Sequence, residues 1–319
     1  MSGRSEPWWG HLKGDPLPFL LSDDEPGVAW RALQGLLGRP PDAPAVVRAR
    51  RGAREKGAAA ALFEGQSEFG TWGSPTAYAA RWSGTAWHVM ALAALGADPE
   101  DPRVERAAEA LLEALHPRSG GFATTRKTAP SPCFSAQVCA ALVRLGYAHH
   151  PRVREAIAWL GSLPEPPWRC GEERHDHDGS CSVAPVATLR LVSEHAPAER
   201  GRLAPLATRA GRFLVDRGLH LHGPAPRGWL AFAHPCLDRA DLLEALVPLA
   251  RLGWEPEPAI LAALLAVLAR QDPLGRWTQH VAAPFGEPAG RPGRWVTLKA
   301  LVVLSAFGGA LCAPCGGGG

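Results

Sequence analysis

One loop of this sequence gathers four residues of the types that bind transition metals. Cys170, His175, His177 and Cys181 follow one another in a Cys-x4-His-x-His-x3-Cys order within twelve residues. Thiolate sulfur and imidazole nitrogen are the ligands that zinc prefers, so zinc is the candidate ion. The spacing matches no common zinc finger or ribbon, so reactive thiols and purely structural cysteines stay open as alternatives.

A second group of candidate residues lies near position 240. Asp238 and Asp241 are three residues apart in the stretch 236–252, which has the composition of an apolar helix. On a helix this spacing places two side chains on one face, where they would hold a cation or share a proton. The alternative is a charge near a helix start. His88, in another apolar stretch, is a candidate base or a hydrogen-bonded histidine of a cavity wall.

The elements that position these residues repeat along the chain. Apolar helices are predicted at intervals of about 50 residues, a spacing typical of repeat architectures, over 84–95, 132–145, 181–192, 236–252 and 295–307. Amphipathic stretches that begin with proline, such as 102–115 and 151–160, alternate with them and are predicted outer helices. Gly96, Gly146 and Gly253 follow three of the apolar stretches, as expected of helix C-terminal caps.

Composition excludes several classes of function. The 319 residues are 46% hydrophobic and 20% charged, which predicts a large core, and the net charge of +3 is too small for a nucleic-acid-binding face. No stretch reaches the roughly 20 apolar residues of a membrane span, and no signal peptide is evident. We therefore expect a cytoplasmic protein whose seven cysteines are not a disulfide framework.

Three loops carry a glycine followed by an aromatic residue. They cover residues 66–72, 116–122 and 271–277, and the first and third run from glutamine to tryptophan. These loops resemble the QW repeat of squalene-hopene cyclases, and Gly121-Phe122 after Gly120 resembles the GGF of protein prenyltransferase β-subunits. The residues themselves predict tight turns in which the aromatic ring staples one outer helix to the next.

The resemblance implies an all-α fold, an α/α toroid of five to six pairs of inner and outer helices. Such a ring surrounds a central, mostly apolar cavity, the default site for an isoprenoid or other apolar ligand. Trp87, Phe134, Trp229 and Trp295 are the aromatic residues expected to line it. Three segments are predicted: an N-terminal segment 1–21, the repeat domain 22–309, and a flexible Cys/Gly tail 310–319.

The same resemblance points to one end of the ring. Cys133, Cys181 and Cys236 stand at predicted starts of successive inner helices, which run parallel in a toroid, so their thiols should surround one mouth of the cavity. A helix N-terminus stabilises thiolate, which suits a ligand or a nucleophile. Cys133 also follows Gly121-Phe122 where prenyltransferases have a zinc-binding cysteine, but Ser131 stands in place of their aspartate.

The catalytic motifs of these families are incomplete in this chain. The DxDD acid motif of class II terpene cyclases does not occur, and no diphosphate-binding cluster is recognisable. Two functions remain in view, since a fold does not fix an activity. One is a cyclase-like or prenyltransferase-like protein that binds an apolar ligand. The other is a non-catalytic toroid scaffold that binds a lipid, a peptide or a protein partner.

Overall fold

The computed structural model describes residues 7–73, 82–118, 120–125, 128–164, 168–170, 176–177 and 180–311. Helices dominate this part of the chain, which confirms the prediction of a helix-rich protein. The strands are short and form three antiparallel pairs: β1 (His116–Arg118) with β2 (Gly121–Ala123), β3 (Asp176–His177) with β4 (Ser180–Cys181), and β5 (Thr278–Gln279) with β6 (Arg291–Pro292).

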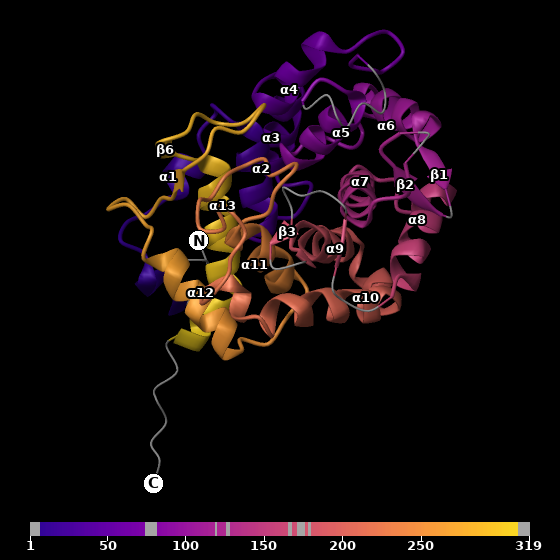
Figure 1. Cartoon of the computed structure of the whole chain (residues 1–319). Coiled ribbons are helices and arrows are strands. Elements are labelled where there is room, and N and C mark those ends of the chain that lie inside the picture. Colours follow the sequence, from indigo (N-terminus) through magenta and orange to yellow (C-terminus); the bar gives the residue numbers. More distant parts are fainter. Residues whose placement is uncertain are drawn as a thin grey trace.

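The apolar repeats form a set of helices that are buried on nearly every side. They are α5 (Thr85–Ala94), α7 (Pro132–Arg144), α9 (Val183–Glu194), α11 (Leu242–Arg251) and α13 (Arg294–Phe307). Each contacts the next in this order. We call these five the inner helices. Figure 1 shows α7, α9 and α11 nearer the middle of the molecule than α8 and α10.

The amphipathic repeats form the outer helices. These are α6 (Pro102–Ala114), α8 (Pro151–Ser162), α10 (Pro197–Val215) and α12 (Pro258–Leu268), and each begins with proline, as the sequence predicts for α6 and α8. Only one side of each is buried; in α8, for example, the buried residues are Val153, Ala156, Ile157 and Leu160, at helical spacing. The outer helices therefore cover the inner set with one apolar face, and α6, α8 and α10 present charged residues to solvent.

The N-terminal part of the repeat region lies between the first and last inner helices. It contains α1 (Leu17–Leu20), α2 (Pro26–Gly35), α3 (Pro44–Glu55) and α4 (Ala58–Leu62), with 3-10 turns at Pro7–His11 and Phe63–Gly65. Two further 3-10 turns lie later in the chain, at Gly218–His220 and Gly308–Leu311. Helix α2 contacts α13. A Cβ on Gly27 would lie 2.8 Å from the carbonyl oxygen of Leu95, the residue after α5. Helix α2 thus bridges α13 and the end of α5.

The predicted glycine caps are present. Gly96, Gly146 and Gly253 have φ values of 72°, 98° and 68°, the left-handed region that favours glycine. The amide after each glycine donates to a carbonyl five residues back, as in Ala97 to Leu92 at 2.9 Å. These are Schellman-type ends, which satisfy carbonyls that the helix leaves unpaired.

The glycine-aromatic loops share one set of hydrogen bonds. The indole Nε1 of Trp72 and of Trp277 each donates, at 2.8 Å, to a carbonyl ten residues earlier in the preceding helix, Leu62 and Val267 respectively. Their backbone amides donate to threonine hydroxyls in the next inner helix, at 3.0 and 3.1 Å. Each loop therefore fastens an outer element to an inner helix.

The last inner helix has the composition of a membrane span. Residues Arg294–Leu311 are the single stretch, among the residues that the structure describes, long and apolar enough to cross a bilayer, and 56% of it is buried in the protein. Helix α13 contacts α11, α12 and α2. Packing within the core accounts for its apolar character, so the stretch is weak evidence for a membrane span.

One predicted element begins later than expected. The fourth inner helix was predicted from Cys236, but α11 begins at Leu242, after a bent segment. The side chain of Asp241 accepts the amide of Glu244 at 3.0 Å and so caps the helix. A capping aspartate has a non-helical backbone, which ends the helix pattern on its N-terminal side.

Candidate metal centre

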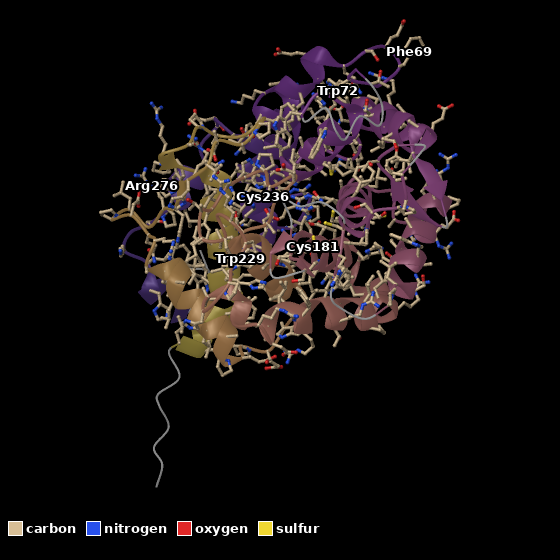
Figure 2. The ribbon with its side chains drawn as sticks, in the orientation of Figure 1. Phe69, Trp72, Cys181, Trp229, Cys236 and Arg276 are labelled. Atoms are coloured by element: carbon tan, nitrogen blue, oxygen red, sulfur yellow. The ribbon has the colours of Figure 1, made fainter. Side chains whose placement is uncertain are left out.

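Three cysteine thiols from separate segments meet at the N-terminal end of the inner helices. Cys133 lies in the first turn of α7, Cys170 in the loop after α8, and Cys181 in β4 just before α9. Their Sγ atoms all lie within 4.8 Å of one another. We call these three residues the thiol cluster. Figure 2 shows Cys181 near the middle of the molecule, far from edge residues such as Phe69.

Local structure fixes each thiol. Ser131 caps α7 by accepting the amide of Phe134, and a proline in the first turn follows it, so Cys133 is held at the helix start. The backbone of Cys181 is paired with Asp176 in the β3–β4 hairpin, and its amide donates to the Trp168 carbonyl at 2.6 Å. Because Trp168 is two residues before Cys170, that bond ties the two cysteine segments together.

The surroundings of the thiols are buried but supply polar contacts. Cys133 and Cys181 have no exposed surface, and Cys170 is half-buried. The amide of Ala184 donates to Cys181 Sγ at 3.4 Å, and Ser131 Oγ lies 3.3 Å from Cys133 Sγ. Hydrogen bonding to Cys170, and burial after it, raises the pKa of Cys133 to about 12. Three ionised thiols therefore require a cation among them.

The donor set fits a zinc ion. Tetrahedral zinc with Zn–S bonds of roughly 2.3 Å places its sulfur ligands about 3.8 Å apart, which a slight contraction of the cluster provides. All three residues are thiols rather than disulfides. The amides at the starts of α7 and α9 supply partial positive charge that stabilises thiolate. Three protein ligands would leave a fourth position on a tetrahedral ion.

The cluster contains part of the predicted metal loop. Cys170 and Cys181 come together as the sequence predicts, and Cys133 joins them from α7. His175 lies outside the described residues. His177 is described by its backbone alone, which pairs with Ser180 in the hairpin. Metal binding by the two histidines therefore stays a prediction.

Cys236 was expected at the same mouth of the ring but does not join the thiol cluster. It lies six residues before α11, where its Sγ donates to the Ala233 carbonyl at 3.2 Å and to Asp241 Oδ2 at 3.4 Å. The expectation was wrong because α11 starts later than predicted. Burial, and the charge of Asp241 after it, raises the pKa of Cys236 well above its usual range, so its thiol is protonated.

The predicted pair of aspartates does not share a helical face. Asp238 lies in the bent segment before α11, whereas Asp241 is the helix cap. Asp241 is fully buried and its Oδ2 also accepts the amide of Ala233 at 2.9 Å. Its carboxylate oxygens thus bind the backbone on both sides of the segment. This corrects the expectation of a shared face, and it gives Asp241 a structural role.

His88 has the contacts of a core histidine. Its ring stacks on Trp72 with centroids 4.6 Å apart, and its Nδ1 lies 3.0 Å from the Gly84 carbonyl. Burial lowers the pKa of His88, so the ring is neutral near pH 7. Of the two alternatives, a base and a hydrogen-bonded histidine, these contacts favour the second.

The four aromatic residues expected around a cavity separate into two groups. Trp87 and Phe134 have no exposed surface and belong to the hydrophobic core. Trp229 is in the core as well, and its Nε1 donates to the Leu219 carbonyl at 2.7 Å, the same ten-residue spacing as the loop tryptophans. Trp295 lines a cavity between the inner helices. The expected aromatic lining thus reduces to one of the four residues.

That cavity is also lined by charged residues that the sequence interpretation missed. Its volume is about 400 Å³, and it lies at the opposite end of α7 from the thiol cluster, beside Arg144 and, on α11, Arg251. The signal was present in the sequence, because Arg144 and Arg251 both precede Leu-Gly at a helix end.

Comparison with known proteins finds a distant structural likeness. No protein-family model and no curated protein matches the sequence. Among solved structures, a variant of the type II terpene cyclase MstE from Scytonema, in complex with geranylgeranyl dihydroxybenzoate as substrate, is 16% identical. The match covers 80% of this chain and 96% of that chain, with a TM-score of 0.30. A likeness this distant carries no argument about ligand or activity.

Proposed function

We propose that this protein binds one zinc ion through Cys133, Cys170 and Cys181. The observation that carries the proposal is the approach of three sulfur atoms, from three separate segments, to within 4.8 Å of one another. Cysteine is at home in a buried core, but a core needs no such convergence. Soft thiolate ligands select zinc among the common divalent ions by ligand type.

We further propose that the helices form an α/α toroid of the kind found in squalene-hopene cyclases and prenyltransferase β-subunits. The succession of contacts from α5 to α13, and the place of α2 between α13 and the end of α5, support a closed ring. Closure leaves no apolar inner face in water, which favours it on energetic grounds. The zinc ion would then lie at one mouth of the ring.

The fourth ligand decides between two functions. A histidine from the loop, His175 or His177, would complete a closed Cys3His site, which is typical of structural zinc. An open position would make the zinc a Lewis acid for a bound substrate. The first suits a non-catalytic scaffold that binds a lipid, peptide or protein partner, and the second suits a prenyltransferase-like or cyclase-like enzyme. Core positions for Trp87 and Trp229 favour the scaffold over an isoprenoid pocket. In either case a cytoplasmic location is proposed.

The test is the zinc content of the purified protein by elemental mass spectrometry. We expect about one zinc per chain in the wild type and its loss in Cys133→Ala, Cys170→Ala and Cys181→Ala. Cys139→Ala is the matched control, because Cys139 is a buried cysteine of the same helix outside the cluster. X-ray absorption at the zinc edge then counts sulfur and nitrogen neighbours and identifies the fourth ligand.

Two results would overturn the proposal. One is a wild-type protein, refolded with zinc, that retains none after dialysis. The other is zinc that is retained equally by the cluster variants and the Cys139→Ala control. Far-UV circular dichroism of each variant separates loss of the metal from loss of the fold.

A further inference from the structure

A charged cavity lies among the C-terminal ends of the inner helices. Cys133 and Arg144 are at opposite ends of α7, about 17 Å apart along the helix axis. The cavity beside Arg144 has a volume of about 400 Å³, within the range of small-molecule sites. Its charged lining comes from five helices, α2, α7, α9, α11 and α13.

Cationic side chains exceed acidic ones around this cavity. Glu194 accepts hydrogen bonds from Arg144 at 3.0 Å and from Arg251 at 2.7 Å. Glu244 is shared in the same way between Arg190, at 3.2 Å, and Lys299. Four cations thus divide two carboxylates, and Arg31 is a fifth cation that lines the same cavity. The surplus is three positive charges.

Arg31 stands out among the five cations. Its Nε atom is buried and has no hydrogen-bond partner among the described residues, and its guanidinium lies 4.1 Å from the centre of the Trp30 ring. Burial, and then the nearby charge of Arg144, lowers the pKa of Arg31 to about 9, so it remains charged at pH 7. A half-buried arginine that keeps its charge beside another arginine is costly unless something binds it.

Other polar atoms of the cavity lack partners in the described part of the chain as well. They are Arg144 Nε, Trp295 Nε1 and His234 Nδ1, and all are buried. The first two are donors. His234 Nε2 lies 3.1 Å from the Ala94 carbonyl and must carry the proton of a neutral ring, so Nδ1 is an acceptor. Unmade hydrogen bonds in one place mark a site for a polar ligand, because each buried unpaired group costs free energy.

Helix ends explain part of this charge but not the unpaired donors. The C-terminus of a helix carries partial negative charge, which favours Arg144 in the last turn of α7 and Arg251 in that of α11. Arg31 and Lys299 lie in the middle of α2 and α13, where no such end exists. An attraction between arginine and the helix C-termini also does not provide a hydrogen-bond acceptor for the Nε atoms of Arg31 and Arg144.

The cavity is reachable from solvent. The side chains of Arg190 and Arg251 are 25% and 35% exposed, whereas those of Glu244 and Glu194 are 7% and 12% exposed. The two arginines therefore lie toward the entrance, with the acids behind them. A soluble anion meets positive charge first, which favours its entry.

We propose that this cavity binds a small, multiply charged oxyanion that also carries a hydroxyl, with Arg31 and Arg144 donating to its oxygens and His234 accepting from its O–H group. Hydrogen phosphate and hydroxylated polycarboxylates share this chemistry. Guanidinium groups bind both phosphate and carboxylate oxygens in planar, charge-assisted pairs. The site is independent of the proposed zinc centre, because the two lie at opposite ends of α7.

The test measures the melting temperature of the full-length protein with inorganic phosphate or citrate, against chloride at the same ionic strength. We expect a rise of roughly 5 °C with the preferred anion near saturation and little change with chloride. Arg31→Gln should weaken binding about ten- to a hundredfold by calorimetry, the range of a lost charge-assisted hydrogen bond. Arg51→Gln is the matched control, since Arg51 is 80% exposed on α3.

A second measurement protects the test against a folding defect. In chloride, Arg31→Gln should melt within roughly 2 °C of the wild type or higher, because it removes a charge that Arg144 repels. Its zinc content should equal that of the wild type, which separates this site from the metal proposal. Equal effects of phosphate, citrate and chloride, or equal anion binding by Arg31→Gln and wild type, would overturn the proposal.

Discussion

The two ends of helix α7 carry opposite chemistry. Its first turn holds Cys133 in a buried group of three thiols, and its last turn holds Arg144 in a network of guanidinium and carboxylate groups. The helix dipole favours this arrangement, since the N-terminus stabilises thiolate and the C-terminus stabilises cations. One end of α7 thus gathers thiols that suit a metal, whereas the other end gathers more cations than carboxylates, which suits an anion.

Of the changes predicted here, removal of zinc from the thiol cluster should lower the stability of the protein most. A tight chelator should lower the melting temperature of the wild type by roughly 8 °C or more, because a ligand present at a thousand times its Kd stabilises a fold by about 4 kcal/mol. Differential scanning calorimetry with and without chelator measures the shift. Cys133→Ala should show no chelator effect, and Cys139→Ala should behave as the wild type. A chelator effect that persists in Cys133→Ala would place the metal elsewhere.

Glu194→Gln should have the next largest effect, on the guanidinium end. Removing this carboxylate leaves Arg144 and Arg251 unpaired and should reduce the free energy of unfolding by about 3 kcal/mol, as measured by denaturant titration. The same variant adds to the positive surplus, so its affinity for the oxyanion should rise. Weaker oxyanion binding by Glu194→Gln would contradict the proposal that the positive surplus of the cavity favours the anion.

The pH dependence provides the control for Glu194. Burial raises the pKa of Glu194, but Arg144 and Arg251 outweigh burial and hold the pKa at about 2. The pKa of Glu194 is lower in the folded protein than in the unfolded chain, where it is about 4.3, so its carboxylate stabilises the fold above about pH 4.3. That stabilisation is lost as the pH falls toward 2. The stability difference between wild type and Glu194→Gln should therefore be constant above roughly pH 5 and shrink between about pH 4.5 and 2.

Trp277→Phe should reduce the stability of the protein least, and it should change neither the thiol cluster nor the charged cavity. It removes the indole donor to the Val267 carbonyl, which still accepts the amide of Arg270, and should cost about 1 kcal/mol of unfolding free energy, the typical net contribution of one hydrogen bond. Zinc content and anion affinity should match the wild type, while chemical denaturation reports the loss. A change in either ligand affinity would show that the loops couple the two ends.

Much of the helical framework could be predicted from local sequence patterns. Prolines at helix starts and glycines at helix ends act on their immediate neighbours, so Pro102, Pro151 and Gly146 mark boundaries that the structure keeps. Asp241 shows where this fails. The apolar pattern predicts a helix from Cys236 onward, whereas the Asp241 side chain caps a helix that begins at Leu242. The hydrogen bonds of Asp241 with the buried amides of Ala233 and Glu244 fix this later start.

The site was predicted in part for the same reason. Cys170 and Cys181 are near each other in sequence, so their spacing indicates a shared ligand set. Cys133 is 37 residues before Cys170, and only the family resemblance placed it beside Cys181. No local pattern links Arg31, Arg144 and Lys299, which come from distant helices. The unpaired donors of Arg31 and Arg144 exist only where those helices pack together.

The sequence by itself determined the helix-rich class, the alternation of buried and amphipathic helices, and the types of ligand available. These follow from periodicity and from residue chemistry, which act over one or two helical turns. Tertiary structure alone decided that Cys133 and Cys170 meet in one cluster with Cys181, that Cys236 is not among them, and that five cations line one cavity with only two carboxylates. Those outcomes depend on how far each helix extends and which neighbour it packs against, because contacts between distant segments are set by the whole core.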